Sequence, residues 1–179
     1  MTRHMQKGNM KKHFALILTM ILMTAALCAC GFGSSDGTDS IPEFTSYDLE
    51  GNEVDSSIFA NADITVVNIW GTFCDPCVDE MPALAEWDAE LPDNVQIIGL
   101  VGDVFETSGA EYAAARKIVA DSGVKFTNVI AAGELAEFMN KVGMYPTTLF
   151  VDSSGKFVHD PFVGADVGGY KDVVKSLTK

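Results

Sequence analysis

The sequence predicts an α/β fold in which a central, mainly parallel sheet is covered by helices on both faces. One observation is the run at residues 64–70, which is almost continuously apolar and β-branched, as a strand buried on both faces is. A second is the alternation of strand-like and helix-like segments over about 140 residues, from Ile41 to the C-terminus. A third is the turn at residues 152–155, after which the chain returns as a hairpin and makes part of the sheet antiparallel. We therefore expect one domain with a mixed sheet.

The first elements are two short strands, a long strand and a helix. Residues 44–49 and 53–56 read as strands because the Glu-Gly-Asn turn at 50–52 separates them. The buried strand at 64–70 follows. A helix is expected over residues 79–91, where apolar residues recur at helical spacing.

The next pair is a strand at residues 95–101 and a helix at 109–121. The strand is again a continuous apolar run. Ser108 and Glu111 have the spacing of a capping box at the start of this helix, and Gly123 is placed to end it.

The remaining elements continue the alternation. Glycine and the Asp-Ser-Ser-Gly turn mark their boundaries. We expect a strand at 126–130, a helix at 134–141 that ends before Gly143, a strand at 147–151, a returning strand at 156–159 and a final helix at 170–177.

Two cysteines, Cys74 and Cys77, lie between the strand at 64–70 and the helix that follows it. Two thiols separated by two residues can close and open a disulfide reversibly. The unpaired N–H groups and the positive dipole end of the helix stabilise a thiolate on the first of them. The pair therefore points to redox chemistry, with Cys74 as the attacking thiol and Cys77, more shielded, as the resolving one.

The same spacing also occurs in zinc sites and in structural disulfides. A zinc site needs four ligands, and no other cysteine or histidine is paired at ligand spacing. A structural disulfide closing so short a loop restricts the unfolded chain very little. The other cysteines and histidines that could be zinc ligands are Cys28, Cys30, His4, His13 and His159. We therefore expect no metal and no cofactor.

The N-terminal 29 residues have the pattern of a secretory signal. Basic residues precede an apolar run at 14–27 that is too short for a confident membrane span. The sequence Leu-Cys-Ala-Cys-Gly at 27–31 is similar to a bacterial lipobox, which makes Cys30 the expected lipid attachment site. Because Cys28 is unusual two residues before the modified cysteine, plain secretion and a retained signal anchor remain open.

The domain organisation follows from this cleavage. Residues 1–29 are the signal, residues 30–40 are a Gly- and Ser-rich tether, and residues 41–179 are the domain. Removing the signal leaves 8 basic and 25 acidic residues, a net charge of −17. That charge argues against nucleic acid and against electrostatic binding to anionic lipid, so the lipid anchor is the expected membrane link. After cleavage and lipidation, Cys74 and Cys77 are the free cysteines that remain. They can pair with each other, which fits an extracytoplasmic location where disulfides persist.

From Ile41 onward the chain resembles the thioredoxin-like family, and within it the membrane-tethered TlpA and ResA branch. The resemblance implies a thioredoxin-like fold with an N-terminal β extension and a helix-strand insertion between Val101 and Glu134. One departure is Gly-Thr-Phe at residues 71–73, where the family usually has Ala-Thr-Trp. The matching segments are Ile-Pro-Glu-Phe at 41–44, Val-Asn-Ile-Trp at 67–70, the cysteine segment at 74–82, and Tyr-Pro-Thr-Thr-Leu-Phe-Val-Asp at 145–152.

The resemblance and the helical spacing suggest further site residues. Glu80 lies three residues after Cys77, on nearly the same helix face, and could exchange a proton with it. The alternative is a solvated carboxylate favoured by the helix dipole. Pro146 resembles the cis-proline that faces the disulfide in this fold, and Tyr145 would contact the partner protein.

The expected function is thus a lipid-anchored extracytoplasmic thiol:disulfide oxidoreductase that reduces disulfides in partner proteins. It would be monomeric and would receive electrons from a membrane thiol transporter. The alternatives are an oxidase of the same fold and a binding protein in which the cysteines are incidental. Peroxidase activity is not expected, because peroxiredoxins carry a proline and a threonine at set distances before the reactive cysteine, and those positions differ here.

Overall fold

The computed structural model describes residues 39–179. The expected signal at 1–29, the attachment residue Cys30 and most of the tether lie outside this range. No helix within residues 39–179 is long and apolar enough to cross a membrane.

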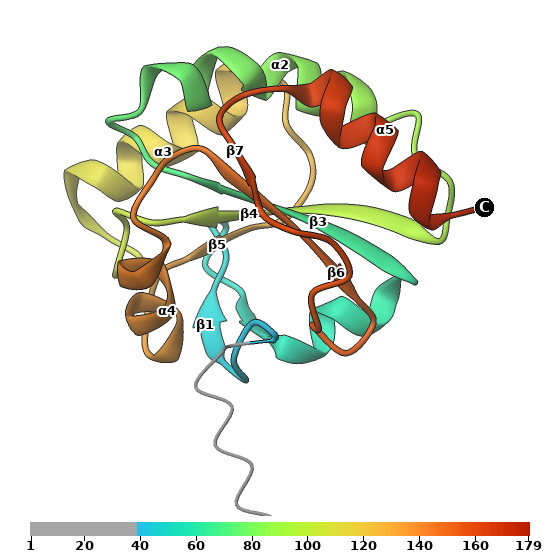
Figure 1. Ribbon diagram of the computed structural model, residues 1–179. Coiled ribbons are helices and arrows are strands. Elements are labelled where there is room, and N and C mark those ends of the chain that lie inside the picture. The colour runs from blue at the N-terminus through green and yellow to red at the C-terminus, as the bar shows by residue number, and fades with distance from the viewer. Residues whose placement is uncertain (1–38) are drawn as a thin grey trace, which may run out of the picture. The chain divides into compact units, whose positions relative to one another are not determined.

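A five-stranded mixed sheet forms the centre of the domain, in the order β5-β4-β3-β6-β7 (Figure 1). β4 pairs in parallel with both β3 and β5, whereas β6 is antiparallel to β3 and β7 to β6. The predicted mixed sheet is confirmed. Its strands are β3 (Ile64–Trp70), β4 (Val95–Val101), β5 (Asn128–Ile130), β6 (Thr147–Asp152) and β7 (Phe162–Val163).

Helices cover both faces of this sheet, as predicted (Figure 1). The side chains of β3 alternate between the two faces, so that Val66 and Trp70 pack in one apolar cluster and Val67 in the other. One cluster joins the sheet to α2 (Asp75–Asp88), α3 (Gly109–Asp121) and α5 (Val167–Leu177), and the other joins it to α4 (Glu134–Val142) and the 3-10 helix η1 (Ser56–Asn61).

The N-terminal β extension is a hairpin of β1 (Thr45–Tyr47) and β2 (Glu53–Asp55). It lies against the edge strand β5, where the Ser46 hydroxyl donates to the Ile130 carbonyl at 2.8 Å and the Leu49 N–H donates to the Asn128 carbonyl at 3.0 Å. The hairpin therefore occupies an edge of the sheet that would otherwise be open to pairing with another chain.

The first strand is shorter than expected, Thr45–Tyr47, and the last helix begins earlier, at Val167. Three further expectations about the elements are wrong. Helix α2 begins at Asp75, not at residue 79, because Pro76 suits the first helical turn. The returning strand is not at residues 156–159; there Phe157 makes an isolated bridge to Val151 and Lys156 makes one to Ser40, and strand β7 forms further on. The predicted capping box at Ser108 is absent: Gly109 has a φ of 93°, so the first turn lacks the geometry that brings the serine hydroxyl to the backbone N–H groups.

Candidate active site

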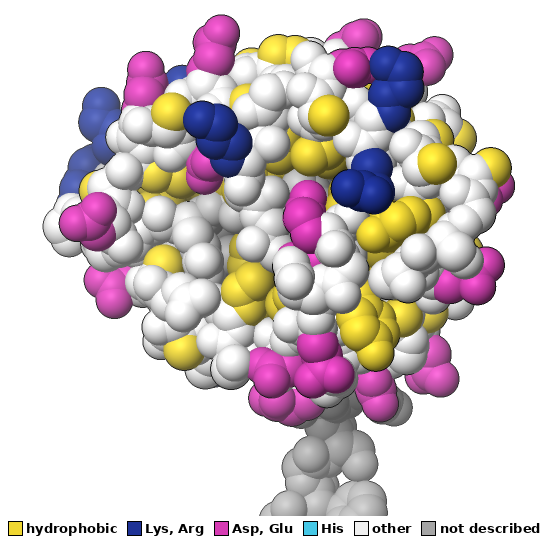
Figure 2. Space-filling model, turned by 180° about the vertical axis from the view of Figure 1, so that it is seen from behind, with side chains coloured by type: hydrophobic (Ala, Val, Ile, Leu, Met, Phe, Trp, Pro, Cys, Tyr) yellow, Lys and Arg dark blue, Asp and Glu magenta, His cyan; other side chains and the backbone are white. Residues whose placement is uncertain are grey.

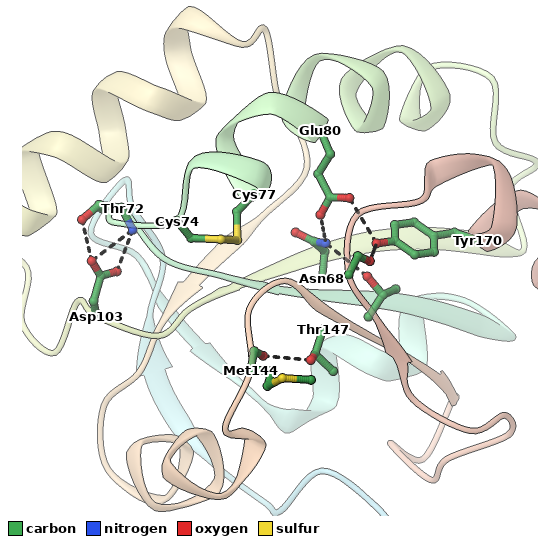
Figure 3. Close-up of a disulfide and its surroundings, with 11 residues drawn as sticks. Asn68, Thr72, Cys74, Cys77, Glu80, Asp103, Met144, Thr147 and Tyr170 are labelled. Atoms are coloured by element: carbon green, nitrogen blue, oxygen red, sulfur yellow. Dashed lines mark hydrogen bonds between the residues drawn. A yellow bond between two sulfur atoms is a disulfide. The ribbon is translucent and has the colours of Figure 1, made fainter.

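Cys74 and Cys77 form a disulfide at the corner between β3 and α2 (Figure 3). Cys74 is the N-cap residue of α2, and Cys77 lies in the first turn. The Cys77 side chain is fully buried and Cys74 is 7% exposed. Cys74 is thus the more accessible of the two cysteines, although it too is largely buried.

The segment that contains Pro146 lies beside this corner. The Tyr145–Pro146 peptide bond is cis, and Thr147 pairs with Ile69 near the end of β3. The Pro146 carbonyl accepts a hydrogen bond from Gly164 N–H at 2.9 Å. The backbone N–H and C=O of Tyr145 make no hydrogen bond to any group of residues 39–179.

Tyr145 connects the proline segment to the loop before the cysteines. Its ring meets Phe73 edge-on with 5.6 Å between ring centroids. A Cβ atom at Gly102 would come within 2.2 Å of the Tyr145 hydroxyl oxygen, so glycine is needed there for the tyrosine to fit. Burial raises the pKa of Tyr145, and the nearby charge of Asp103 adds to the rise.

Asp103 holds the loop that precedes the disulfide (Figure 3). Its carboxylate accepts hydrogen bonds from the Thr72 N–H at 3.0 and 3.1 Å and from the Thr72 hydroxyl. Sequence reasoning missed this contact. The available signal was its place just after β4, because the carboxyl ends of adjacent parallel strands meet at one edge of the sheet.

Glu80 is buried behind the disulfide, with 6% of its surface exposed. Its Oε1 accepts from Asn68 Nδ2 at 2.8 Å, and its Oε2 lies 3.1 Å from the Tyr170 hydroxyl. Burial raises the pKa of Glu80, and the hydrogen bonds from Asn68 and Tyr170, which favour the charged form, oppose part of that rise. Glu80 is therefore not the solvated carboxylate of the alternative interpretation. No pattern in the sequence indicates that Tyr170, at the other end of the domain, meets it.

Large exposed apolar side chains gather on the segments that form this corner. Four of the five such side chains among residues 39–179 lie there. Phe73 and Met144 immediately precede Cys74 and Tyr145, Val163 pairs with Thr147, and Phe105 follows Asp103 by two residues. Exposed apolar side chains grouped in this way are typical of surfaces that bind other proteins.

The buried acid should make folding stability depend on pH. Because the folded state holds the Glu80 proton more tightly than the unfolded state does, stability should fall as pH rises from the ordinary glutamate pKa, about 4.3, through the raised folded pKa. We expect Glu80→Gln to remove this loss, so that the variant gains on the wild type as pH increases. Urea unfolding of the oxidised protein from about pH 4 to about pH 8 measures it. Parallel stability curves for the two proteins would contradict a raised pKa.

Comparison with known proteins identifies the family. The Redoxin family matches residues 37–174. The chain is 33% identical over 118 residues to the thiol-disulfide oxidoreductase ResA of Bacillus thuringiensis strain Al Hakam, with 65% of this chain and 64% of the relative covered. It thus spans just under two thirds of that relative's length. With ResA of Bacillus cereus strain ZK the identity is 30% over 161 residues, which cover 83% of this chain and 88% of the relative.

Solved structures show the same fold. The thioredoxin domain of a thiol-disulfide oxidoreductase from Bacteroides vulgatus superimposes with a TM-score of 0.63 at 20% identity, covering 82% of this chain and all of that one. The predicted thioredoxin-like fold is thereby confirmed. The chain belongs to the Redoxin family and, within it, to the ResA-like thiol-disulfide oxidoreductases.

Proposed function

We propose that this protein is a lipid-anchored, extracytoplasmic thiol-disulfide oxidoreductase that reduces disulfides in partner proteins and acts as a monomer. The observation that carries the proposal is the disulfide at the start of α2, beside a backbone segment at Tyr145 that has unpaired hydrogen-bonding groups. Family membership supports the reaction class.

The reaction has two exchange steps. In the first, the Cys74 thiolate attacks one sulfur of the partner disulfide, forms a mixed disulfide, and releases the other partner sulfur as a thiolate. In the second, Cys77 attacks the Cys74 sulfur, closes the Cys74–Cys77 bond and releases the second partner thiol. Two electrons pass to the partner, which gains two thiols for one disulfide.

Glu80 is the proposed proton acceptor for the second step. Cys77 must lose its proton to become a nucleophile, and Glu80 lies one helical turn further on, on the same side of α2. The raised pKa of Glu80 in the disulfide form means that this carboxyl readily keeps the proton after the disulfide has closed. The reverse transfer would protonate Cys77 when the disulfide opens.

The partner is proposed to bind as an extended segment at Tyr145 and Pro146. Because Pro146 has no N–H, the unpaired N–H and C=O of Tyr145 are the groups available to a partner strand. The exposed side chains of Phe73 and Met144 favour apolar residues next to the partner's cysteine. Acidic side chains outnumber lysines and arginines over the face shown in Figure 2, so strongly acidic partners should be disfavoured.

A reductant outside the cytoplasm needs a supply of electrons, because disulfides persist there. A membrane protein that passes electrons from cytoplasmic thiols to Cys74–Cys77 would supply them. A net disulfide-forming oxidase is the second candidate, since thiol exchange runs in either direction. The direction is tested by mixing the reduced protein with an oxidised partner and counting thiols: the reductase gives two new partner thiols, and the oxidase gives none.

The lipid anchor is a separate proposal that rests on Cys30. We expect Cys30→Ala to move the protein from the membrane fraction to the soluble fraction, because the acidic domain has no electrostatic attraction to anionic lipid. Fractionation followed by mass spectrometry of the N-terminal peptide measures this. If the variant stays in the membrane and the wild-type peptide carries no lipid, a retained signal anchor replaces the lipid.

A further inference from the structure

The hydroxyl of Tyr170 lies at the meeting point of three polar groups (Figure 3). Tyr170 is on α5 and fully buried. Its oxygen is 2.6 Å from the Gly164 carbonyl oxygen and 3.1 Å from Glu80 Oε2, and it accepts a hydrogen bond from the Asp166 N–H at 3.2 Å. Neither sequence reasoning nor the exchange chemistry assigns this residue a role.

A phenol has one proton, and here two acceptors compete for it. The hydroxyl is within donating distance of both, at 2.6 Å from the Gly164 carbonyl and 3.1 Å from Glu80 Oε2. A protonated Glu80 is an uncharged and therefore weaker acceptor, so the Tyr170 proton should then point to the nearer Gly164 carbonyl.

Ionisation of Glu80 should change this arrangement. A carboxylate is a stronger acceptor than a backbone carbonyl, so the Tyr170 proton should turn toward Glu80. The Gly164 carbonyl would then lose its donor. A change of charge at Glu80 thus reaches the backbone at Gly164 through a single hydroxyl rotation.

Gly164 connects this change to the proposed partner-binding segment. Its N–H donates to the Pro146 carbonyl at 2.9 Å, and it directly follows β7, whose Val163 pairs with Thr147. Hydrogen bonds therefore run from Glu80 through Tyr170 and Gly164 to Pro146.

Few other charges act on this chain of bonds. The titratable groups near Glu80 and Tyr170 are Cys77, which is held in the disulfide, and Asp166, whose Oδ1 accepts from the Gly169 N–H. From β3 and β6 the neighbours are the uncharged Asn68 and Thr148. The ion pairs within residues 39–179 lie elsewhere, at Lys117–Asp121 and Lys171–Glu90.

We propose that Tyr170 is a positioning residue that transmits the protonation state of Glu80 to the Pro146 segment through Gly164. The proposal rests on the proposed function, in which Glu80 gains and loses a proton during each cycle. Partner binding and proton transfer would then influence each other, because energetic coupling between two sites is reciprocal.

The test is a pH titration of the oxidised full chain by NMR, in detergent and without a partner. It follows the amide shift of Gly164 and the side-chain carboxyl carbon of Glu80. In the wild type the two signals should change with the same midpoint. Glu80→Gln should abolish the change at Gly164, and in Tyr170→Phe the Glu80 carboxyl should still titrate while Gly164 no longer follows it.

Tyr112→Phe is the matched control, because the Tyr112 hydroxyl also donates to a backbone carbonyl, that of Leu49 at 2.8 Å, away from the site. It should keep the change at Gly164. A Gly164 signal that is independent of pH in the wild type, or that follows Glu80 undiminished in Tyr170→Phe, would overturn the proposal. If Tyr170→Phe does not fold, the wild type can still overturn the proposal, because a Gly164 signal that does not follow Glu80 excludes the connection. Since no electrons are transferred, failure here is distinct from failure of the reductase function.

Discussion

Cys77→Ser is expected to stop the reaction at the mixed disulfide and hold the partner covalently on Cys74. The serine hydroxyl cannot attack the Cys74 sulfur in the second step, so turnover should fall to the uncatalysed rate while the first step proceeds. The loss of the disulfide should also leave Cys74, the more accessible of the two cysteines, as a free thiol. Non-reducing electrophoresis followed by mass spectrometry of the trapped species measures this.

The controls separate the two oxidoreductase functions from a binding protein. Cys74→Ser and the double variant should trap nothing, because the attacking thiol is missing. A reductase or an oxidase should each give covalent complexes that a reducing agent releases. If Cys77→Ser traps no partner while noncovalent binding persists unchanged in all variants, the protein is a binding module and the oxidoreductase proposal fails.

Glu80→Gln is expected to slow the second exchange step by about 10²-fold, the lower end of the usual range for general acid-base catalysis. Glutamine has the same shape and can still accept from Asn68, but it cannot take the proton from Cys77. The variant should also lose the pH dependence of the rate that belongs to Glu80. Rapid-mixing kinetics of mixed-disulfide resolution, recorded over a range of pH, measures both effects.

Glu86→Gln is the matched control for this substitution. Glu86 is on the same helix, is exposed, and lies far along α2 from the cysteines. Its removal should leave the rate and its pH profile as in the wild type. Equal rates for Glu80→Gln and Glu86→Gln would mean that Glu80 only fills space behind the disulfide.

The sequence was sufficient for elements whose apolar pattern is local. Strands β3 and β4 and helix α3 have the bounds that their patterns predict, because continuous β-branched runs and helical periodicity depend on neighbouring residues only. The sequence does not predict the start of α2 correctly, because residues 75–78 show no helical spacing of apolar side chains. Strand β7 was missed because two residues are too few to form a pattern, and only pairing with β6 defines them.

The candidate site also combines features that are local in the sequence with contacts between distant residues. The two cysteines and the proline are short-range signals that can be read from the chain. The contacts of Glu80 and Asp103 cannot be read from the chain in this way. Tyr170 is 90 residues from Glu80, and Thr72 is 31 residues from Asp103. Helical spacing places Glu80 on the side of Cys77, but only the packing of α5 makes that side a buried one.

The reduction potential of the Cys74–Cys77 pair tests the central claim most directly. It can be measured on the full chain in detergent, equilibrated in dithiol buffers and quantified by thiol trapping. The account predicts a value near or below about −220 mV, in the range of thioredoxin and the glutaredoxins, because a reductant must give up its electrons readily. A value near about −120 mV, as for a strong oxidant of this fold, would contradict the proposed direction and make the protein a disulfide-forming oxidase.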